Sequence, residues 1–215
     1  MTRTAADLTR EKALIWRVVH RDNVPWILEH GLHCANGSVK DPNYVSIGKP
    51  DLIVDRSSRT VPIPPGGVLA DYVPFYFTPF SPMVYNIVTG RGVRQRERGE
   101  LCFVVSSLHL VSESGLKFAF ADRHAYLSRA EFFSDLKDLD RLEWARWQAR
   151  DFKRDPDDPL RFERYEAEAL VHKHVPVTAV KGVVCYDSTI RNSIADQIAS
   201  RSLGVRAVLR PEWYF

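Results

Sequence analysis

The feature that most constrains the fold of this chain is a carboxylate at the start of an apolar run. The run extends from Ala167 to Val171 (AEALV) and has the composition of a buried strand. An ionised carboxylate beside buried positions is costly unless a partner or a task compensates for it. Two interpretations of Glu168 stay open: it faces water on an edge strand, or the strand directs it into a cleft.

Short strands and helices follow one another without regular alternation, which favours the α+β class. Strands are expected at Leu14 to Val19, Leu101 to Ser106, Phe118 to Phe120, Ala167 to His174, Val180 to Tyr186 and Arg206 to Leu209. Helices are expected from Asp22 or Asn23 to Gly31, from Ser81-Pro82 towards Thr89, from Leu108 to Ser114, and from Ser188 to about Arg201. The length of 215 residues, 45% of them apolar, suits one domain over residues 1–215.

Two segments interrupt this pattern. Residues 32–67 are rich in turn signals, and we expect an irregular loop, of the length that is usually functional or disordered. The aromatic block from Asp71 to Phe77 contains Pro74, which argues against a regular central strand.

Composition sets broad limits on partners and compartment. The formal charge of +3 permits a nucleic-acid partner without demanding one. The three cysteines are far apart and form no CxxC pair, so a reducing, cytoplasmic setting is expected. The N-terminus lacks the pattern of a signal peptide, and no apolar stretch approaches the length that spans a bilayer, so no membrane partner is expected.

The common catalytic motifs are absent. The pair Gly66-Gly67 lacks the pattern and context of a phosphate loop, and neither GxSxG nor HExxH occurs. His172 and His174 share one face of an expected strand, but further ligands do not lie nearby, so no metal site is predicted.

Several segments resemble the DarT family of DNA ADP-ribosyltransferase toxins. The core of the resemblance is Gly66 to Phe77 (GGVLADYVPFYF) followed by Ser81 to Tyr85 (SPMVY). The supporting segments are His20 to Asn23 with Ile27-Leu28 and His30-Gly31, Asp122 to His124 with Leu127-Ser128, the Glu168 segment, and Trp213 to Phe215. They occur in order from about residue 14 to residue 215.

The resemblance implies an ADP-ribosyltransferase-like α+β fold with a split central sheet and flanking helices. It implies transfer of ADP-ribose from NAD, as co-substrate, to a base in single-stranded DNA, with thymine expected. It also implies a macrodomain antitoxin as the partner that removes the modification. The catalytic glutamate of the family corresponds to Glu168, and its catalytic arginine to Arg56, with Arg59 as the rival.

The resemblance also implies contacts to NAD. The residues are Arg17, His20, Asn23, Tyr72, Phe75 and Tyr76. Many relatives have histidine on the first strand where this chain has Arg17, whose guanidinium suits a pyrophosphate. Flat aromatic faces suit the nicotinamide ring.

DNA contacts are expected from His124 and from a charged stretch of about Leu142 to Pro159, which contains Trp147 and Arg154, and from Arg59. Tryptophans among charges can stack on bases, although such residues are at least as often anchors of a loop.

In the implied chemistry, Glu168 stabilises the positive charge that develops on the ribose as the nicotinamide bond breaks. Arg56 is always cationic and therefore steadies the acceptor base or the phosphates. Alternatives are a transferase that acts on guanine, RNA or protein, a hydrolase of NAD, and a non-enzymatic single-strand-binding module.

Overall fold

The computed structural model describes residues 5–153 and 155–215, so the predicted DNA contact Arg154 lies outside the described residues. Within them, a mixed sheet of eight strands forms the centre, in the order β10-β9-β4-β1-β3-β7-β5-β6. The strands are β1 (Leu14–His20), β3 (Tyr72–Tyr76), β4 (Leu101–Ser107), β5 (Phe118–Ala121), β6 (Phe132–Phe133), β7 (Glu168–His172), β9 (Gly182–Cys185) and β10 (Arg206–Leu209). A second, small sheet pairs β2 (Leu32–His33) with β8 (His174–Val175).

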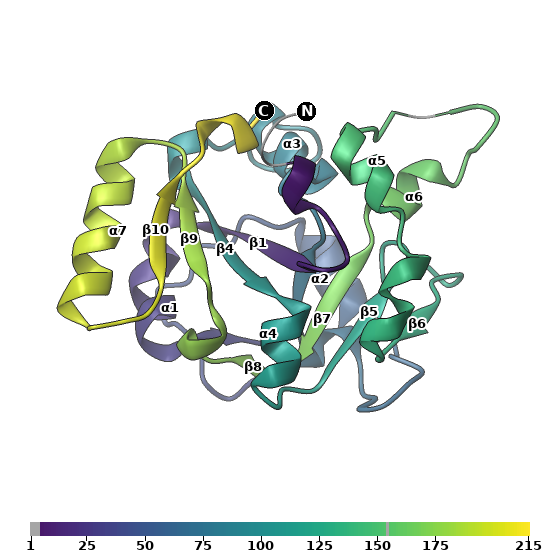
Figure 1. Ribbon diagram of the computed structural model, residues 1–215, viewed down its shortest axis with the longest axis horizontal. Coiled ribbons are helices and arrows are strands. Elements are labelled where there is room, and N and C mark those ends of the chain that lie inside the picture. The colour runs from purple at the N-terminus through teal and green to yellow at the C-terminus, as the bar shows by residue number, and fades with distance from the viewer. Residues whose placement is uncertain (1–4, 154) are drawn as a thin grey trace.

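The helices surround this sheet (Figure 1). They are α1 (Val24–His30), α2 (Pro50–Arg56), α3 (Pro82–Thr89), α4 (Leu108–Glu113), α5 (Trp144–Ala149), α6 (Arg161–Tyr165) and α7 (Ser188–Ser200). Helix α7 packs along β9 and β10, and in Figure 1 α4 lies in front of the sheet and α2 behind it. The expected α+β class is confirmed.

The large sheet is split between β1 and β3. Strand β1 pairs with β4 along its whole length but meets β3 at the single register pair Trp16–Tyr76. Strand β3 pairs throughout with β7 on its other side. The sheet therefore consists of two halves whose strands pair at one register position, in agreement with the split sheet that the family resemblance implied.

Pro74 lies at this split. It occupies the middle of β3, opposite Leu170 of β7, although the sequence argued against a regular strand there. The backbone oxygen of Pro74 accepts a hydrogen bond from the Arg17 side chain of β1 rather than from a strand backbone. Because the nitrogen and oxygen of one strand residue point to the same edge, the missing N–H of proline also faces the split and interrupts no ladder.

Local signals placed most element ends correctly. Ser81 caps α3, and its hydroxyl accepts a hydrogen bond from Val84 N at 3.4 Å. Gly31 ends α1 with a positive φ of 77°. The expected first residues of two helices do not cap them: the side chain of Asp187 rather than Ser188 caps α7, and the amide of Asn23 makes no cap at α1.

The segment 32–67 is more ordered than the sequence predicted. It contributes β2 and the helix α2, in which Pro50 stands in the first turn, a position where its missing N–H has no intrahelical partner. None of the seven residues of α2 is buried. The helix therefore lacks the apolar face by which helices are recognised in a sequence.

The charged stretch before β7 folds onto the core, and its arginines form ion pairs with carboxylates of the same stretch. Trp147 is fully buried, its ring stacks on Phe77, and its Nε1 donates to Tyr165 O at 2.9 Å. The arginine–carboxylate pairs of the stretch are Arg146 with Glu143 and Asp158, Arg164 with the same two, and Arg161 with Asp151 and Asp155. The prediction that Trp147 stacks on DNA is therefore wrong, because neighbouring side chains already cover its ring.

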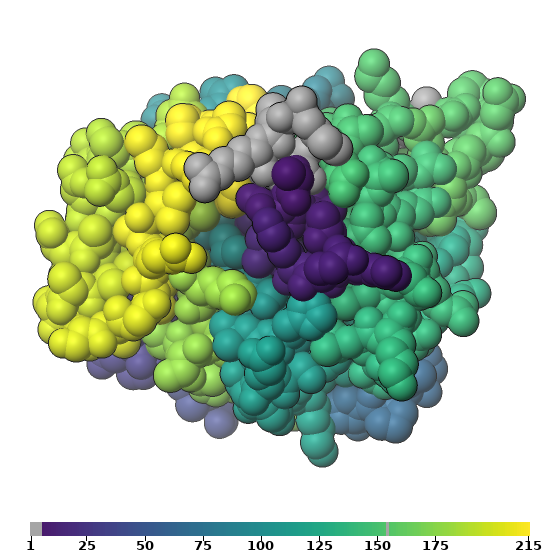
Figure 2. All heavy atoms as spheres, in the orientation of Figure 1, coloured from purple at the N-terminus to yellow at the C-terminus, as the bar shows by residue number. Residues whose placement is uncertain are grey.

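The N-terminal segment closes the face opposite α2. Figure 2 shows it in purple, lying between the yellow C-terminal part and the green middle part. Gln148 Nε2 of α5 donates to Leu8 O at 3.0 Å, and Leu8 is buried. The segment therefore packs as part of the core.

Candidate functional site

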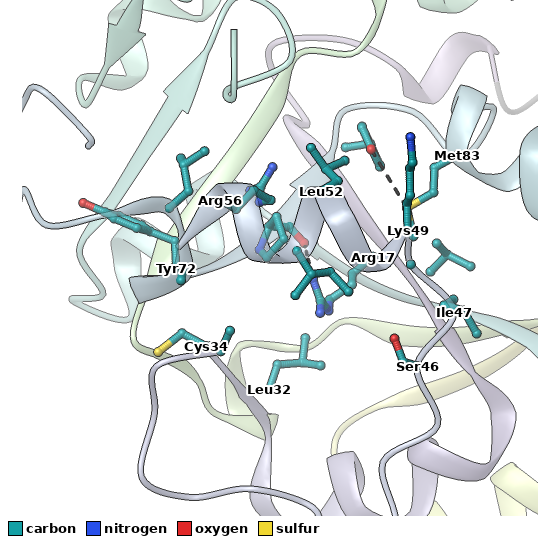
Figure 3. A pocket seen from close by; sticks show the side chains of 18 of the residues that line it. Arg17, Leu32, Cys34, Ser46, Ile47, Lys49, Leu52, Arg56, Tyr72 and Met83 are labelled. Carbon is teal, nitrogen blue, oxygen red and sulfur yellow. Dashed lines mark hydrogen bonds between the residues drawn. The ribbon is translucent and has the colours of Figure 1, made fainter. Parts of the chain in front are cut away.

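A cavity of about 610 Å³ lies over the split in the sheet. Its walls come from both halves: β1 contributes Trp16 and Arg17, and β3 contributes Tyr72, Pro74 and Tyr76. Figure 3 shows Arg17 and Arg56 reaching into the same space, with Tyr72 at one end and Met83 at the other. A volume of this size is typical of pockets for small molecules.

Glu168 lies in the wall of this cavity with 2% of its side chain exposed. As the first residue of β7 it stands between Tyr76 of β3 and Ala121 of β5 in register. Its Oε1 accepts a hydrogen bond from the backbone N–H of Ala125 at 3.0 Å. Of the two interpretations left open by the sequence, the structure therefore shows a buried carboxylate in a cleft.

Arg56 holds this carboxylate at two points. Nη1 donates to Glu168 Oε1 at 3.1 Å, and Nη2 lies 2.9 Å from Oε2. His124 Nδ1 lies 3.4 Å from the same Oε1. The three side chains come from α2, β7 and the loop after β5, so the site forms only in the folded chain.

The charges of the pair support one another. Burial alone would raise the pKa of Glu168, but Arg56 and His124 bring that pKa below its usual value. Burial alone would lower the pKa of Arg56, but Glu168 raises it above the usual range. The cavity thus contains a fixed carboxylate and a fixed guanidinium, both ionised at neutral pH.

Arg59, the rival of Arg56 in the sequence, has a different environment. Its Nη2 donates to Leu127 O at 2.9 Å and to Ser128 O at 3.4 Å. It does not line the cavity. The structure therefore brings Arg56, and not Arg59, to Glu168, and it assigns Arg59 to tethering the loop that carries His124.

One residue of β1 suits an anionic ligand such as NAD. Arg17 lines the cavity, and its Nη1 donates to Pro74 O at 3.0 Å, which leaves other guanidinium donors for a ligand. Trp16 also contributes to the cavity wall, but its Nε1 is fully buried and is therefore not open to a ligand.

Strand alternation divides the aromatic block into two sets. Tyr72 and Tyr76 line the cavity, whereas Phe75 is buried on the other face of β3 and does not. The predicted NAD contact by Phe75 is therefore wrong. Burial and the nearby Glu168 raise the pKa of Tyr76 well above its usual value, so its phenol stays protonated.

The wall that carries Tyr72 is fixed by Asp71. The Asp71 carboxylate accepts hydrogen bonds from Lys173 Nζ at 2.8 Å, Val68 N at 2.9 Å and Asn36 Nδ2 at 3.2 Å. The Lys173 and Val68 bonds lower the pKa of Asp71 to about 2. Gly67 fits beside this carboxylate because a Cβ there would come within 2.5 Å of Asp71 Oδ2, at a φ of +82°.

His20 and Asn23 lie outside the cavity, contrary to the prediction that they contact NAD. His20 is buried, its Nδ1 accepts from Asp22 N at 3.2 Å, and its Nε2 faces Glu100. Asn23 exchanges two hydrogen bonds with the backbone of Val45, of 2.9 and 2.8 Å. Asn23 therefore positions the loop of the cavity wall, because Ser46 and Ile47 follow directly.

Sequence reasoning missed several lining residues. Ile47, Lys49, Leu52 and Met83 line the cavity in Figure 3, and Glu166 lies in the same wall. The pair Lys49-Pro50 was a usable signal, because proline is favoured in the first turn of a helix. Among the predicted DNA contacts, only His124 lines the cavity within the described part of the chain.

The described residues contain no group of three or more His, Cys, Asp or Glu side chains placed to hold a metal ion. In the same ranges, no helix has the length and apolar character needed to cross a membrane.

Comparisons with known proteins identify one family. The family described as "ssDNA thymidine ADP-ribosyltransferase, DarT" matches residues 16–215. A DNA ADP-ribosyl transferase of Escherichia coli O127:H6 is 47% identical over 212 residues, which cover 98% of this chain and 97% of the relative.

Solved structures show the same arrangement of the chain. DarT of Thermus sp. 2.9 in complex with ADP-ribosylated ssDNA superposes with a TM-score of 0.87 at 35% identity, covering 95% of this chain and 97% of that one. Its complex with NAD+ gives a TM-score of 0.82 at 33% identity, with 94% and 98% covered. Thermosipho africanus DarTG in complex with ADP-ribose, at 17% identity and a TM-score of 0.74, shares the fold over 94% of this chain and 51% of that one.

Proposed function

The chain belongs to the DarT family of DNA ADP-ribosyltransferases, and from that premise we propose that Glu168 and Arg56 form its catalytic pair and that thymidine in single-stranded DNA is its acceptor. The protein is an NAD-dependent DNA ADP-ribosyltransferase with NAD as co-substrate. The observation that carries the proposal is the buried Glu168 carboxylate, held by Arg56 at two points in the cavity over the split.

Glu168 supplies the electrostatic part of catalysis. Its pKa lies below the usual value, so the carboxylate is ionised throughout the neutral range. A negative charge fixed at a buried position stabilises the positive charge on the ribose in the transition state more than in the ground state. Arg56, Ala125 N and β7 hold the carboxylate in place before the substrate arrives.

The other cavity residues bind and orient the reactants. Arg17 offers guanidinium donors to the pyrophosphate of NAD, and Tyr72 and Tyr76 offer flat faces to the nicotinamide ring. His124 lies beside Glu168 on the loop that we assign to the acceptor strand. Each of these roles follows from the side chain and from its place in the cavity wall.

The remaining expectations are proposals of the same kind. We propose that a macrodomain antitoxin reverses the modification, since the family resemblance pairs these toxins with such a partner. We also propose that the described elements form one ADP-ribosyltransferase domain and that the protein acts in the cytoplasm, where both NAD and DNA are present.

The test uses NAD and a set of single-stranded oligonucleotides that differ only in whether thymidine is present. Mass spectrometry is expected to find an ADP-ribose adduct on thymidine-containing strands alone. An adduct on a strand with guanine but no thymidine, or on protein, would contradict the proposed acceptor. Hydrolysis of the adduct by a purified macrodomain enzyme tests the proposed partner.

A further inference from the structure

A second carboxyl group, that of Glu166, lies in the wall of the catalytic cavity. Glu166 is the residue at which α6 ends, two positions before Glu168. Its backbone N–H is bonded to Glu163 O at 3.1 Å, but its side chain makes no hydrogen bond or ion pair with any described residue. The mechanism described above does not use this group.

The reaction releases a proton that some group must accept. In thymine within DNA, the only N–H is at N3. When N3 attacks the ribose, the N3–H electron pair forms the new N–C bond, and the C–N bond to nicotinamide breaks with its electrons going to the neutral leaving group. The N3 proton is left over, and an adjacent base that receives it in the transition state accelerates the step.

The catalytic pair is poorly suited to accept this proton. Arg56 is already protonated, and its pKa is raised further by Glu168. The Glu168 carboxylate has a lowered pKa because of Arg56 and His124, so it binds protons weakly. The phenol of Tyr76 stays protonated and has no free base form at neutral pH.

The hydrogen bonding of His124 also excludes this residue as the acceptor of the N3 proton. Its Nδ1 accepts the N–H of Tyr126 at 3.3 Å, which in the neutral ring places the proton on Nε2. In this tautomer Nε2 carries the hydrogen and Nδ1 is already engaged, so neither ring nitrogen is free to accept the N3 proton.

We propose that the Glu166 carboxylate is the general base that accepts the N3 proton of the target thymine. The inference rests on the thymidine acceptor proposed above. The ionisable groups that face Glu166 are Glu168 on β7, Glu163 on α6 and Tyr76 on β3. Burial and the two neighbouring glutamates raise the pKa of Glu166 to about 8, which is close to the working pH, as suits a general base.

The first test compares wild type with Glu166→Gln, which keeps the shape of the side chain and removes its basicity. The wild-type kcat with a thymidine oligonucleotide is expected to rise with pH and level off above about 8, as Glu166 ionises. Glu166→Gln is expected to lower kcat by about 10²–10⁴-fold and to abolish that rise, whereas the Kd for NAD changes less than about twofold. Glu166→Asp, which retains a carboxylate, is expected to recover part of kcat.

The second test varies the acidity of the acceptor. Deoxyuridine and 5-fluorodeoxyuridine differ by one small substituent, and fluorine makes the N3–H more acidic. If Glu166 removes this proton, the loss caused by Glu166→Gln is expected to be smaller on the fluorinated strand. A structural role for Glu166 would give the same loss on both strands.

These outcomes separate the two proposals. A wild-type enzyme that leaves thymidine unlabelled overturns the proposed acceptor. A wild-type enzyme that labels thymidine, together with a Glu166→Gln variant of unchanged kcat and pH profile, overturns the role of Glu166 alone. The exposed Glu113 of α4, which does not line the cavity, provides the matched control variant Glu113→Gln.

Discussion

Arg56 and Glu168 are separated by 112 positions in the sequence and meet at two nitrogen–oxygen contacts of 3.1 and 2.9 Å. The pair joins α2, which has no buried residue, to the first residue of a central strand. The contact that prepares the carboxylate for catalysis also sets the position of the helix. Substitutions of Arg56 and substitutions of Glu168 are therefore expected to differ in their effects.

Glu168→Gln is expected to abolish transfer with little effect on folding. The amide keeps a hydrogen-bond acceptor for Arg56 and Ala125 N but carries no negative charge for the transition state. The loss of kcat is expected to reach about 10²–10³-fold or more. Mass spectrometry of the oligonucleotide measures the product, with Glu113→Gln as the control. Transfer by Glu168→Gln at the wild-type rate would falsify the assigned role.

Arg56→Ala is expected to change the pH dependence as well as the rate. Without the guanidinium, burial dominates and the pKa of Glu168 rises. The carboxylate then protonates at a higher pH, so activity at the acid end is lost earlier than in wild type. Removal of one partner of a buried pair also costs about 3–5 kcal/mol of stability.

Pre-steady-state rates between pH 5 and 8, roughly the range of greatest protein stability, measure this shift when all proteins also carry Glu166→Gln, which removes the pH dependence assigned to Glu166. Arg56→Lys retains the charge without the two-point geometry and is expected to lie between wild type and alanine. If the rate fell at the same pH on the acid side for Arg56, Arg56→Lys and Arg56→Ala, the role assigned to Arg56 would be contradicted.

Arg17→Ala is expected to weaken NAD binding. A hydrogen bond to a charged group contributes about 1.5–3 kcal/mol, which corresponds to roughly a 10–100-fold increase in the Kd for NAD. Calorimetric titration in the Glu168→Gln background measures binding without turnover. An unchanged Kd would mean that Arg17 serves only to hold Pro74 O.

Trp147→Ala is expected to act on stability rather than on DNA binding. Loss of a fully buried tryptophan costs about 3–5 kcal/mol. Trp147→Phe, which keeps an apolar ring against Phe77, is expected to bind single-stranded DNA with the affinity and salt dependence of wild type. If Trp147→Phe bound single-stranded DNA more weakly than wild type and kept the wild-type melting temperature, the stacking role predicted from the sequence would be supported.

Asp71 is expected to make the cavity wall sensitive to acid. Its pKa of about 2 in the folded protein lies below the usual value of 3.8, so its contribution to stability is complete above about pH 4 and is lost as the pH falls towards 2. Because Lys173 is half exposed, we expect a contribution of about 1–2 kcal/mol after solvent screening. Urea unfolding of wild type and Asp71→Asn at pH 7 and pH 3 measures it, and the difference should shrink at the lower pH.

The sequence predicted the parts of the fold that depend on local pattern. Strands β1, β4 and β10 follow from runs of aliphatic residues, and α3 from the Ser81-Pro82 start signal. Glu168 was recognisable because a carboxylate in an apolar run requires compensation. These inferences need no knowledge of distant residues.

The rest depends on long-range contacts. Helix α2 has no buried face and is positioned by Arg56, so its residues carry no periodic signal. Phe75 was misplaced because the face to which it points depends on the exact phase of β3. Trp147 was misplaced because the charges around it pair with one another and cover a core residue.

The single register pair between β1 and β3 has a mechanical consequence. A sheet resists sliding because every strand is tied to the next by a continuous ladder, and here that ladder is missing along one line. The two halves are instead bridged by the Arg17 side chain at Pro74 O. A ligand that contacts Arg17 of β1 together with Tyr72 or Tyr76 of β3 would link the two halves, so NAD binding is expected to raise the melting temperature of the protein.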